Sequence, residues 1–216
     1  MTNNRDKPVK LDIDAVFGNA VPKISHTVRV VLIKWIHRIP HLVMVHQNAR
    51  EEGYLQKDGT WWFERERIGL PGGRNDPKKP LTADADGITI METLIETAVR
   101  EAKEETGIIL PEDFFTERLS FHSELRRSDR EEFDFCQDHY YFGELPEDMV
   151  FGEITEKSEI KEALFIPLSK IPLPGDAVPF SWKQQQGMLA LFQSLETKAE
   201  DASYYAVTLK KRAAMR

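Results

Sequence analysis

The sequence lacks the features on which several classes of protein depend. It contains a single cysteine, Cys136, so an internal disulfide and a zinc site built from several cysteines are both excluded. It also has no long apolar run, because the stretch that comes nearest, residues 26–37, is interrupted by Arg29, Lys34 and His37. A membrane-spanning helix needs about 20 consecutive apolar residues, and none is therefore expected.

Positive charge is also scarce. The chain has 29 lysine and arginine residues against 36 aspartate and glutamate residues, a formal net charge of −7 at pH 7. This balance argues against electrostatic binding of bulk nucleic acid, but it allows a phosphorylated small molecule held by local cations or by a metal ion. The first 25 residues contain no apolar core of the kind found in signal peptides, so we expect a cytoplasmic protein.

The share of hydrophobic residues, 41%, is enough for a packed globular core. Residues 1–25 are predicted to form an N-terminal extension, because prolines and a Gly-Asn pair interrupt them, and residues 198–216 a solvated C-terminal tail. Between these ends, stretches rich in apolar and β-branched residues predict strands. The predicted strands cover residues 26–37, 41–47, 114–125, 134–144 and 160–168.

Two helices are predicted within this domain. Apolar residues recur with helical spacing over residues 90–105, which predicts a helix with Thr89 as its N-cap and Glu92 as the capping-box partner. A second helix is expected over residues 181–196. The order of strands, helix, strands and helix indicates an α+β or α/β sandwich with a mixed β-sheet between helices.

Two aromatic residues, Trp61 and Phe63, alternate along the chain after an Asp58-Gly59 turn. Alternating aromatic residues in a strand are typical of a protein core, so we expect these two rings to be buried. The alternative is that one of them stacks on the base of a nucleotide.

The first helix ends in a cluster of acidic residues. Glu101, Glu104 and Glu105 are spaced i, i+3 and i+4, so their side chains share one helical face. Like charges at this spacing destabilise a helix by roughly a few tenths of a kcal/mol, and the negative end of the helix dipole adds about 0.3–1 kcal/mol. Gly107 indicates that the helix stops here. The cluster becomes favourable when a cation lies against it, and three carboxylates suit Mg2+ or Mn2+.

The pattern around these acids resembles the Nudix box, in which a glutamate stands before the run Arg-Glu-x-x-Glu-Glu-x-Gly with seven residues between them. Here Glu92 stands in that position before REAKEETG, residues 100–107. The segments 69–73 and 158–172 also resemble those that flank the box in this family. The resemblance to Nudix hydrolases covers residues 26–197 and implies the Nudix fold for this domain.

One departure concerns the glycine that the family places shortly before the box glutamate. The corresponding position before Glu92 is Asp86. The best match is Gly73, which leaves residues 74–91 where the family has five residues and so predicts an inserted loop. Lengthening a loop costs little closure entropy, so the fold can accept the insertion. Gly87, one position out of register, is the competing match.

The resemblance implies roles for the residues that match the Nudix box. Glu101 and Glu105 are expected to be the principal ligands of Mg2+ or Mn2+, with Glu104 on a second ion or on its waters. The Gly73 carbonyl is expected to be a further ligand. Arg100 is expected to hold the acids in register.

A further carboxylate in this family often comes from a loop before a late strand, where it acts as a base or an extra ligand. Glu159 is our candidate for it, with Glu156 and Glu153 as alternatives. Arg67 and Arg126 are the candidate contacts to the phosphates of the substrate, although such arginines are more commonly solvated surface charges.

The resemblance also implies the reaction, which is cleavage of the pyrophosphate bond in a nucleoside diphosphate linked to another moiety. ADP-ribose or a nucleotide sugar is favoured as this small-molecule partner. A dinucleoside polyphosphate, a nucleoside triphosphate and an RNA 5′-triphosphate are the alternatives. The competing function is a Nudix-fold domain that senses a nucleotide without cleaving it. The sequence leaves a homodimer open.

Overall fold

The computed structural model describes residues 24–50, 53–55, 59–63, 65–75, 91–124 and 135–171. Several features predicted from the sequence lie outside these ranges: most of the N-terminal extension and of the inserted loop, including Gly87, and also Arg126, the helix over residues 181–196 and the C-terminal tail.

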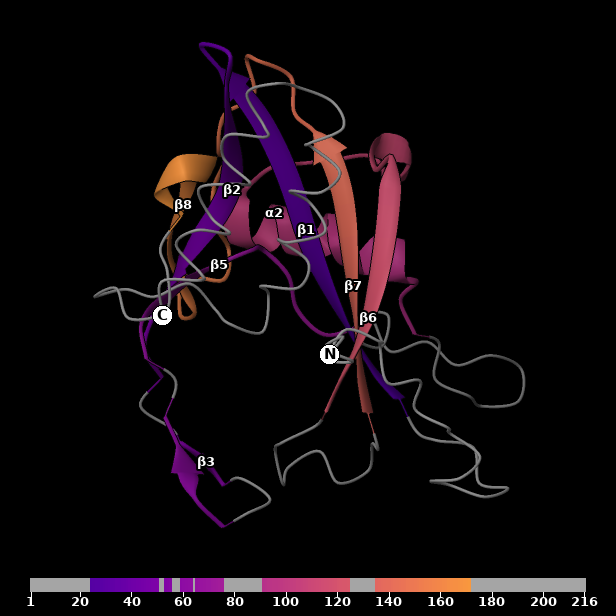
Figure 1. The fold of residues 1–216 in the computed structure, drawn as a ribbon, viewed down its shortest axis with the longest axis vertical. Helices are drawn as coiled ribbons and strands as arrows, with labels where there is room; N and C mark the ends of the chain where they lie inside the picture. The colour runs from indigo at the N-terminus through magenta and orange to yellow at the C-terminus, as the bar shows by residue number, and fades with distance from the viewer. Residues whose placement is uncertain are drawn as a thin grey trace, which may run out of the picture.

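Within the described residues, a mixed six-stranded sheet forms the body of the molecule (Figure 1). Its strands are β1 (Ile24–Ile36), β2 (Ile39–Gln47), β5 (Arg67–Gly69), β6 (Glu117–Glu124), β7 (Phe135–Glu144) and β8 (Ile160–Pro167). Strand β1 pairs antiparallel with β2 and parallel with β7, and β6 pairs antiparallel with β7. Both β5 and β8 pair antiparallel with β2. The five predicted strands are therefore present, with ends that differ by a few residues.

Strands β1 and β2 separate along part of their length, and this separation makes room for the site. They pair only between residues 33–36 of β1 and residues 39–42 of β2. Farther along β2, strand β5 takes the place of β1. The loop that follows β5 then runs along β1, where the Val28 N–H donates a hydrogen bond to the Gly73 carbonyl at 2.8 Å. The Pro-Gly-Gly segment is thus fixed to the sheet by backbone hydrogen bonds.

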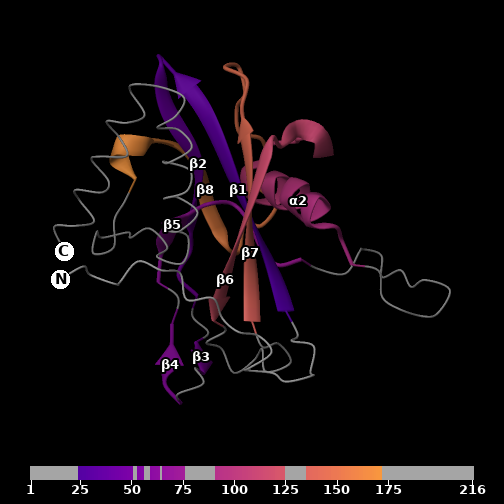
Figure 2. The same cartoon turned by 45° about the vertical axis from the view of Figure 1, so that its right-hand side comes forward.

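Helix α2 (Leu94–Thr106) lies across one face of the sheet (Figure 2) and contacts β1, β7 and β8. Its small residues Ala98 and Ala102 are fully buried against Val28 and Val30 of β1, so the helix approaches the strands closely. Among the described residues, no helix is long and apolar enough to cross a membrane.

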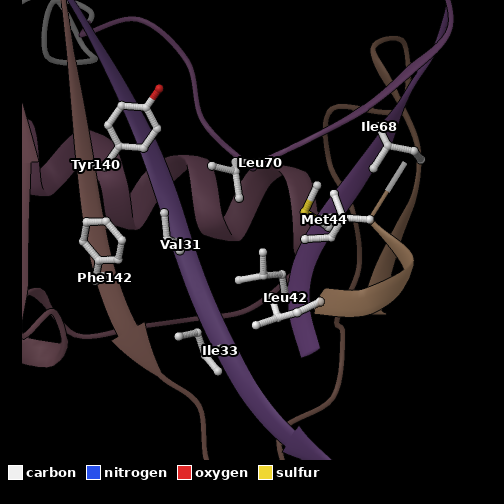
Figure 3. Packing of buried hydrophobic residues seen from close by; sticks show 10 residues of the cluster. Val31, Ile33, Leu42, Met44, Ile68, Leu70, Tyr140 and Phe142 are labelled. Carbon is white, nitrogen blue, oxygen red and sulfur yellow. The ribbon is translucent and has the colours of Figure 1, made fainter. Parts of the chain in front are cut away.

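The opposite face of the sheet carries a second apolar cluster (Figure 3). Residues of β1 alternate between the two faces, so Val31 lies in this cluster while its neighbours Val30 and Leu32 lie on the α2 side. Leu42 and Met44 of β2 are also fully buried here. The sheet therefore carries an apolar cluster on each face, and within the described residues helix α2 covers one of them; the mixed sheet with a helix is confirmed.

The short strands β3 (Tyr54–Leu55) and β4 (Trp61–Trp62) pair with each other in a separate hairpin, away from the main sheet in both views (Figure 1, Figure 2). The side chains of Trp61 and Phe63 are 64% and 55% exposed. The expectation that these rings belong to the core is therefore wrong. The reason is that strands of two residues are too short to enclose large rings, and the Phe63 ring lies over Gly53, which has no side chain to cover it.

The start of helix α2 also differs from the prediction. The N-cap is Thr93, whose side chain accepts a hydrogen bond from the Glu96 N–H, while the Glu96 side chain accepts one from the Thr93 N–H. The predicted N-cap, Thr89, is therefore wrong. The sequence contains the Thr-x-x-Glu pattern twice, and Glu92 is not used for capping because its carboxylate binds Arg100. The predicted stop at Gly107 is confirmed, since this residue adopts the left-handed conformation with φ of 70°.

We predict that Thr93→Ala lowers the free energy of unfolding by about 1 kcal/mol, because one backbone N–H of the first turn loses its acceptor. Urea denaturation monitored by circular dichroism measures this loss. Thr93→Ser keeps the hydroxyl and serves as the control, with stability close to that of the original protein. Equal losses in both variants would mean that the threonine methyl group, and not the cap, provides the stability.

Candidate active site

Helix α2 presents its acidic residues in two different environments. Glu101 and Glu105 are only 7% and 5% exposed, and Glu104 is partly exposed. Because Ala98 and Ala102 hold the helix against β1, the side chains of Glu101 and Glu105 face the Pro-Gly-Gly loop at the open part of the sheet. Two of the three predicted acids are therefore directed into the protein.

The two glycines of this loop allow the acids to approach the backbone. The Gly72 N–H donates a hydrogen bond of 2.7 Å to Oε2 of Glu105. Gly72 has a φ of 143°, and a Cβ atom at this position would lie 2.1 Å from the Val28 carbonyl oxygen. A Cβ atom on Gly73 would lie 2.3 Å from Oε1 of Glu101. Gly72 thus requires glycine, whereas a side chain at Gly73 would displace the Glu101 carboxylate.

Arg100 contacts the acids on the other side of the cluster. Its Nε donates to both carboxylate oxygens of Glu92 at 3.0 Å, and its Nη1 lies 2.7 Å from Oε2 of Glu104 and 2.8 Å from Oε1 of Glu101. Burial opposes the charged form of Arg100, but the adjacent carboxylates outweigh it and raise the pKa of the guanidinium. A further hydrogen bond, from Nη2 to the Arg74 carbonyl, joins the helix to the end of the glycine loop. Arg100 thus contacts three carboxylates and the backbone of Arg74 at once.

The two buried carboxylates carry more negative charge than their surroundings neutralise. Burial raises the pKa of Glu101 to about 7, although Arg100 acts in the opposite direction. Burial and the charge of Glu101 raise the pKa of Glu105 to about 8, against the effect of the Gly72 N–H. A cation placed against this pair would stabilise the ionised form of both groups.

Arg29 of β1 belongs to the site although the sequence analysis treated it only as an interruption of an apolar run. Its Nη1 donates a hydrogen bond of 2.6 Å to the Gly72 carbonyl, and its charge lowers the pKa of Glu101 and of Glu105. The signal available in the sequence was a single arginine between two valines, Val28 and Val30. The sequence could not show which groups Arg29 contacts, because they lie on a loop and on a helix that are distant from it in the chain.

The loop before β8 brings a further acid to the cluster. The N–H groups of Gly152 and Thr155 donate to the carbonyls of Thr106 and Glu104 at 3.2 Å and 2.9 Å, which joins this loop to the C-terminal end of α2. Glu159 follows in the same loop, and its charge contributes to the raised pKa of Glu105.

The candidate acids of this loop differ in their ion pairs. Glu159 forms an ion pair with Arg50, and both side chains are a little less than half exposed. Glu153, an alternative candidate, pairs with Lys157 at 3.0 Å and is exposed. The charge of Glu159 helps to raise the pKa of Glu105, so Glu159 is favoured over Glu153 as the further acid.

Arg67, one of the two candidate phosphate contacts, lies in β5 just before the glycine loop. Its Nε donates a hydrogen bond of 2.6 Å to Oε1 of Gln47, the residue opposite it in β2. The neighbouring Asn48 N–H donates to the Glu159 carbonyl at 2.8 Å, so Arg67 and Glu159 lie near the same end of β2. The other candidate, Arg126, lies outside the described residues.

The donor set can be compared with the requirements of a divalent cation. Within the part of the chain that the structure describes, no three histidine, cysteine, aspartate or glutamate side chains converge on one point that could hold a metal ion. The Glu104 carboxylate accepts a hydrogen bond from Arg100. The pair of Glu101 and Glu105 nevertheless fits a hard cation, because two buried carboxylates repel each other and lie against the backbone of the glycine loop.

An open depression of about 490 Å³ lies on the solvent side of α2. It shares two residues with the acidic cluster, Arg100 and Glu104, and a cation, Lys103, also borders it. The remaining lining residues are Glu96, Val99, Glu112 and Thr155. There is consequently room for a bound molecule beside the exposed edge of the cluster.

Comparison with known proteins bears on the family. A family model described as the NUDIX domain matches residues 27–186, which is more than half of the chain. No curated protein sequence matches the chain.

Two solved structures are similar in fold. The MutT/nudix family protein from Enterococcus faecalis is 14% identical, with a TM-score of 0.52, and the match covers 89% of this chain and 71% of that one. The NUDIX domain of Shewanella oneidensis NrtR, in a cocrystal structure with ADP ribose, is 16% identical with a TM-score of 0.52, and the match covers 86% and 94% of the two chains. Identities this low support the fold, a mixed sheet with a helix across it.

We predict that the stability of the protein in chelator falls as the pH rises from about 4.5 to about 8. The folded state of a buried acid with a raised pKa binds more protons than the unfolded state in this window, so the free energy of unfolding decreases there and levels off above it. The expected loss is several kcal/mol, because a change of one unit in a pKa corresponds to about 1.4 kcal/mol. Urea denaturation at a series of pH values measures it.

The matched variants for this experiment are Glu105→Gln and Glu153→Gln. The first removes the buried ionisable group and keeps an acceptor for the Gly72 N–H, so much of the pH-dependent loss should disappear. The second changes an exposed acid and should keep the original slope. An unchanged slope in Glu105→Gln would show that Glu105 is not the source of the dependence.

We also predict that Arg29→Gln lowers the free energy of unfolding at pH 8 in chelator by about 1–3 kcal/mol, because a charged hydrogen bond and a counter-charge to Glu105 are lost. Added Mg2+ should recover more stability in this variant than in the original protein. Thermal unfolding with and without Mg2+ provides the comparison, and Arg118→Gln, an exposed arginine on β6, is the control. Equal stability of the two variants in chelator would contradict this role for Arg29.

Proposed function

Because the chain belongs to the Nudix hydrolase family, we propose that it hydrolyses the pyrophosphate bond of a nucleoside diphosphate linked to another moiety. The observation that supports this proposal most directly is the buried pair of Glu101 and Glu105 against the Gly72-Gly73 loop. Their raised pKa values, about 7 and about 8, reflect a site whose negative charge is suited to a divalent cation and its bound diphosphate.

Glu101 and Glu105 would hold the cation, Mg2+ or Mn2+, with a carbonyl of the Gly72-Gly73 segment beside them. Glu104 would bind a second ion or order its waters after release from Arg100. A bound divalent ion neutralises phosphate charge and makes water nucleophilic near neutral pH.

The side chains of the protein supply positioning and proton transfer. Arg100 fixes the carboxylates of α2 through its contacts to Glu92, Glu101 and Glu104. Glu159 accepts the proton of the attacking water, while the bond from the water oxygen to phosphorus forms and the bridging P–O bond breaks. Arg67 and Arg126 bind the phosphates of the substrate, and Arg67, which donates to Gln47 in the structure, turns toward them when the substrate is bound.

ADP-ribose and nucleotide sugars are the substrates that we favour. The NUDIX domain of Shewanella oneidensis NrtR, similar in fold to this chain, was crystallised with ADP ribose. The net charge of −7 disfavours RNA 5′-triphosphates, because a long polyanion meets overall repulsion. Dinucleoside polyphosphates and nucleoside triphosphates are the remaining alternatives.

We predict Mg2+-dependent release of AMP from ADP-ribose, or of a nucleoside monophosphate from a nucleotide sugar. The purified protein is incubated with both, and with diadenosine polyphosphates, nucleoside triphosphates and triphosphorylated RNA, in Mg2+, Mn2+ or chelator. Chromatography of the products then identifies the substrate. Reaction in 18O-labelled water shows which phosphorus is attacked, because only that phosphate gains the heavy oxygen.

Glu105→Gln should lower kcat by about 10³-fold, because the substituted amide carries no charge to hold the cation. Glu153→Gln should keep the original rate, and circular dichroism spectra should be alike for all three proteins. Full activity in Glu105→Gln would contradict the assignment of the site. Tight binding of ADP-ribose by calorimetry, without cleavage in either metal, would instead identify a nucleotide-sensing domain.

A further inference from the structure

A row of three polar side chains crosses the sheet on strands that carry none of the acids described above. Ser120 of β6 lies directly opposite His139 of β7, and its Oγ is 2.8 Å from Nδ1 of that histidine. The other ring nitrogen of His139, Nε2, is 3.0 Å from Nδ1 of His26 on β1. The row therefore consists of a hydroxyl and two imidazoles joined by two hydrogen bonds of good length.

These two distances restrict where the protons lie. A neutral imidazole has one N–H donor and one acceptor, so His139 donates in one of its hydrogen bonds and accepts in the other. When the Ser120 hydroxyl donates to Nδ1 of His139, the Nε2–H of His139 donates to Nδ1 of His26. Partial burial lowers the pKa of His26, which favours the neutral ring that this arrangement needs as its acceptor.

The members of the row differ in their access to solvent. His139 is only 4% exposed, His26 is half-buried and Ser120 is exposed. The ring centroids of His26 and His139 lie 5.2 Å apart and the ring planes are inclined by 30°, as expected for two rings that meet through their nitrogen atoms. The hydroxyl is thus the group that a reagent can reach, and the ring beneath it is held in a fixed orientation by packing and by its second hydrogen bond.

A serine with a histidine base, itself oriented by a third group, is the arrangement that activates hydroxyl nucleophiles. We propose that Ser120 is an activated nucleophile that accepts an acyl group from an ester, a reaction separate from pyrophosphate hydrolysis. His139 is its general base, and His26 is a positioning residue that keeps the proton of His139 on Nε2.

The proposed step balances without a further reactant. The Ser120 oxygen forms a bond to the acyl carbon while its proton passes to Nδ1 of His139. The bond between the acyl carbon and the alcohol oxygen then breaks, and the leaving alcohol takes the proton from Nδ1. The products are an acyl ester of Ser120 and a free alcohol, and hydrolysis by water through the same base returns the free serine.

The test uses the full-length protein and a fluorophosphonate, a reagent that labels activated serines with loss of fluoride. We expect labelling of Ser120, located by tandem mass spectrometry of peptides, at a rate about 10²-fold or more above that of the urea-unfolded protein. Ser158→Ala, which changes an exposed serine on another loop, should keep the label, and Ser120→Ala should lose it. Labelling of the folded protein no faster than of the unfolded protein, or labelling that survives Ser120→Ala, would overturn the proposal.

Two variants of His26 separate activation from a purely structural network. Asparagine can place its Oδ1 near the position of the acceptor nitrogen, whereas alanine removes the acceptor. We expect His26→Ala to lower the labelling rate by about 10-fold or more and His26→Asn to recover most of it, with the thermal unfolding of both variants measured alongside. Equal rates in His26→Ala and the original protein would overturn the role of His26. Formation of acetyl-Ser120 from p-nitrophenyl acetate, with a burst of p-nitrophenolate, would identify the acyl group as the one transferred.

Discussion

The hydrogen bond from the Gly72 N–H to Glu105 joins helix α2 to the sheet at the place where β1 and β2 separate. This contact needs a loop that follows β1 closely and a helix that approaches the strands closely. Gly72 provides the first, because a side chain there would meet the Val28 carbonyl. Ala98 and Ala102 provide the second. The positions of Glu101, Glu104 and Glu105 follow from this junction, since these acids lie on the helix that it fixes.

The junction also concentrates negative charge, and arginines from separate elements offset part of it. Arg29 comes from β1 and Arg100 from α2 itself. Arg29 donates a hydrogen bond to the Gly72 carbonyl and Arg100 donates one to the Arg74 carbonyl, and the charge of each arginine lowers the pKa of Glu101. Their charges are not sufficient, because Glu101 and Glu105 keep raised pKa values. A protein that buries repelling charges without full compensation loses stability, and such groups are typically retained where a ligand supplies the missing charge.

The row of Ser120, His139 and His26 is a second group of hydrogen-bonded polar side chains on the same sheet. Here one buried imidazole, that of His139, is hydrogen-bonded to groups on the two neighbouring strands, and both hydrogen bonds can form between neutral partners. Neutral groups carry a smaller desolvation cost than the carboxylates of α2, so this row needs no counter-ion. The sheet thus holds a charged site where its strands separate and a neutral network where they pair.

The sequence alone determined the strands, the C-terminal end of α2 and the shared face of Glu101, Glu104 and Glu105, because these follow from local periodicity and from the conformational preference of Gly107. Local pattern could not choose between two Thr-x-x-Glu capping signals, and the choice of Thr93 reflects the use of Glu92 by Arg100. Tertiary structure decided which acids are buried, placed Arg29 beside them and left Trp61 exposed. These outcomes depend on contacts between segments far apart in the chain, which spacing along a sequence does not encode.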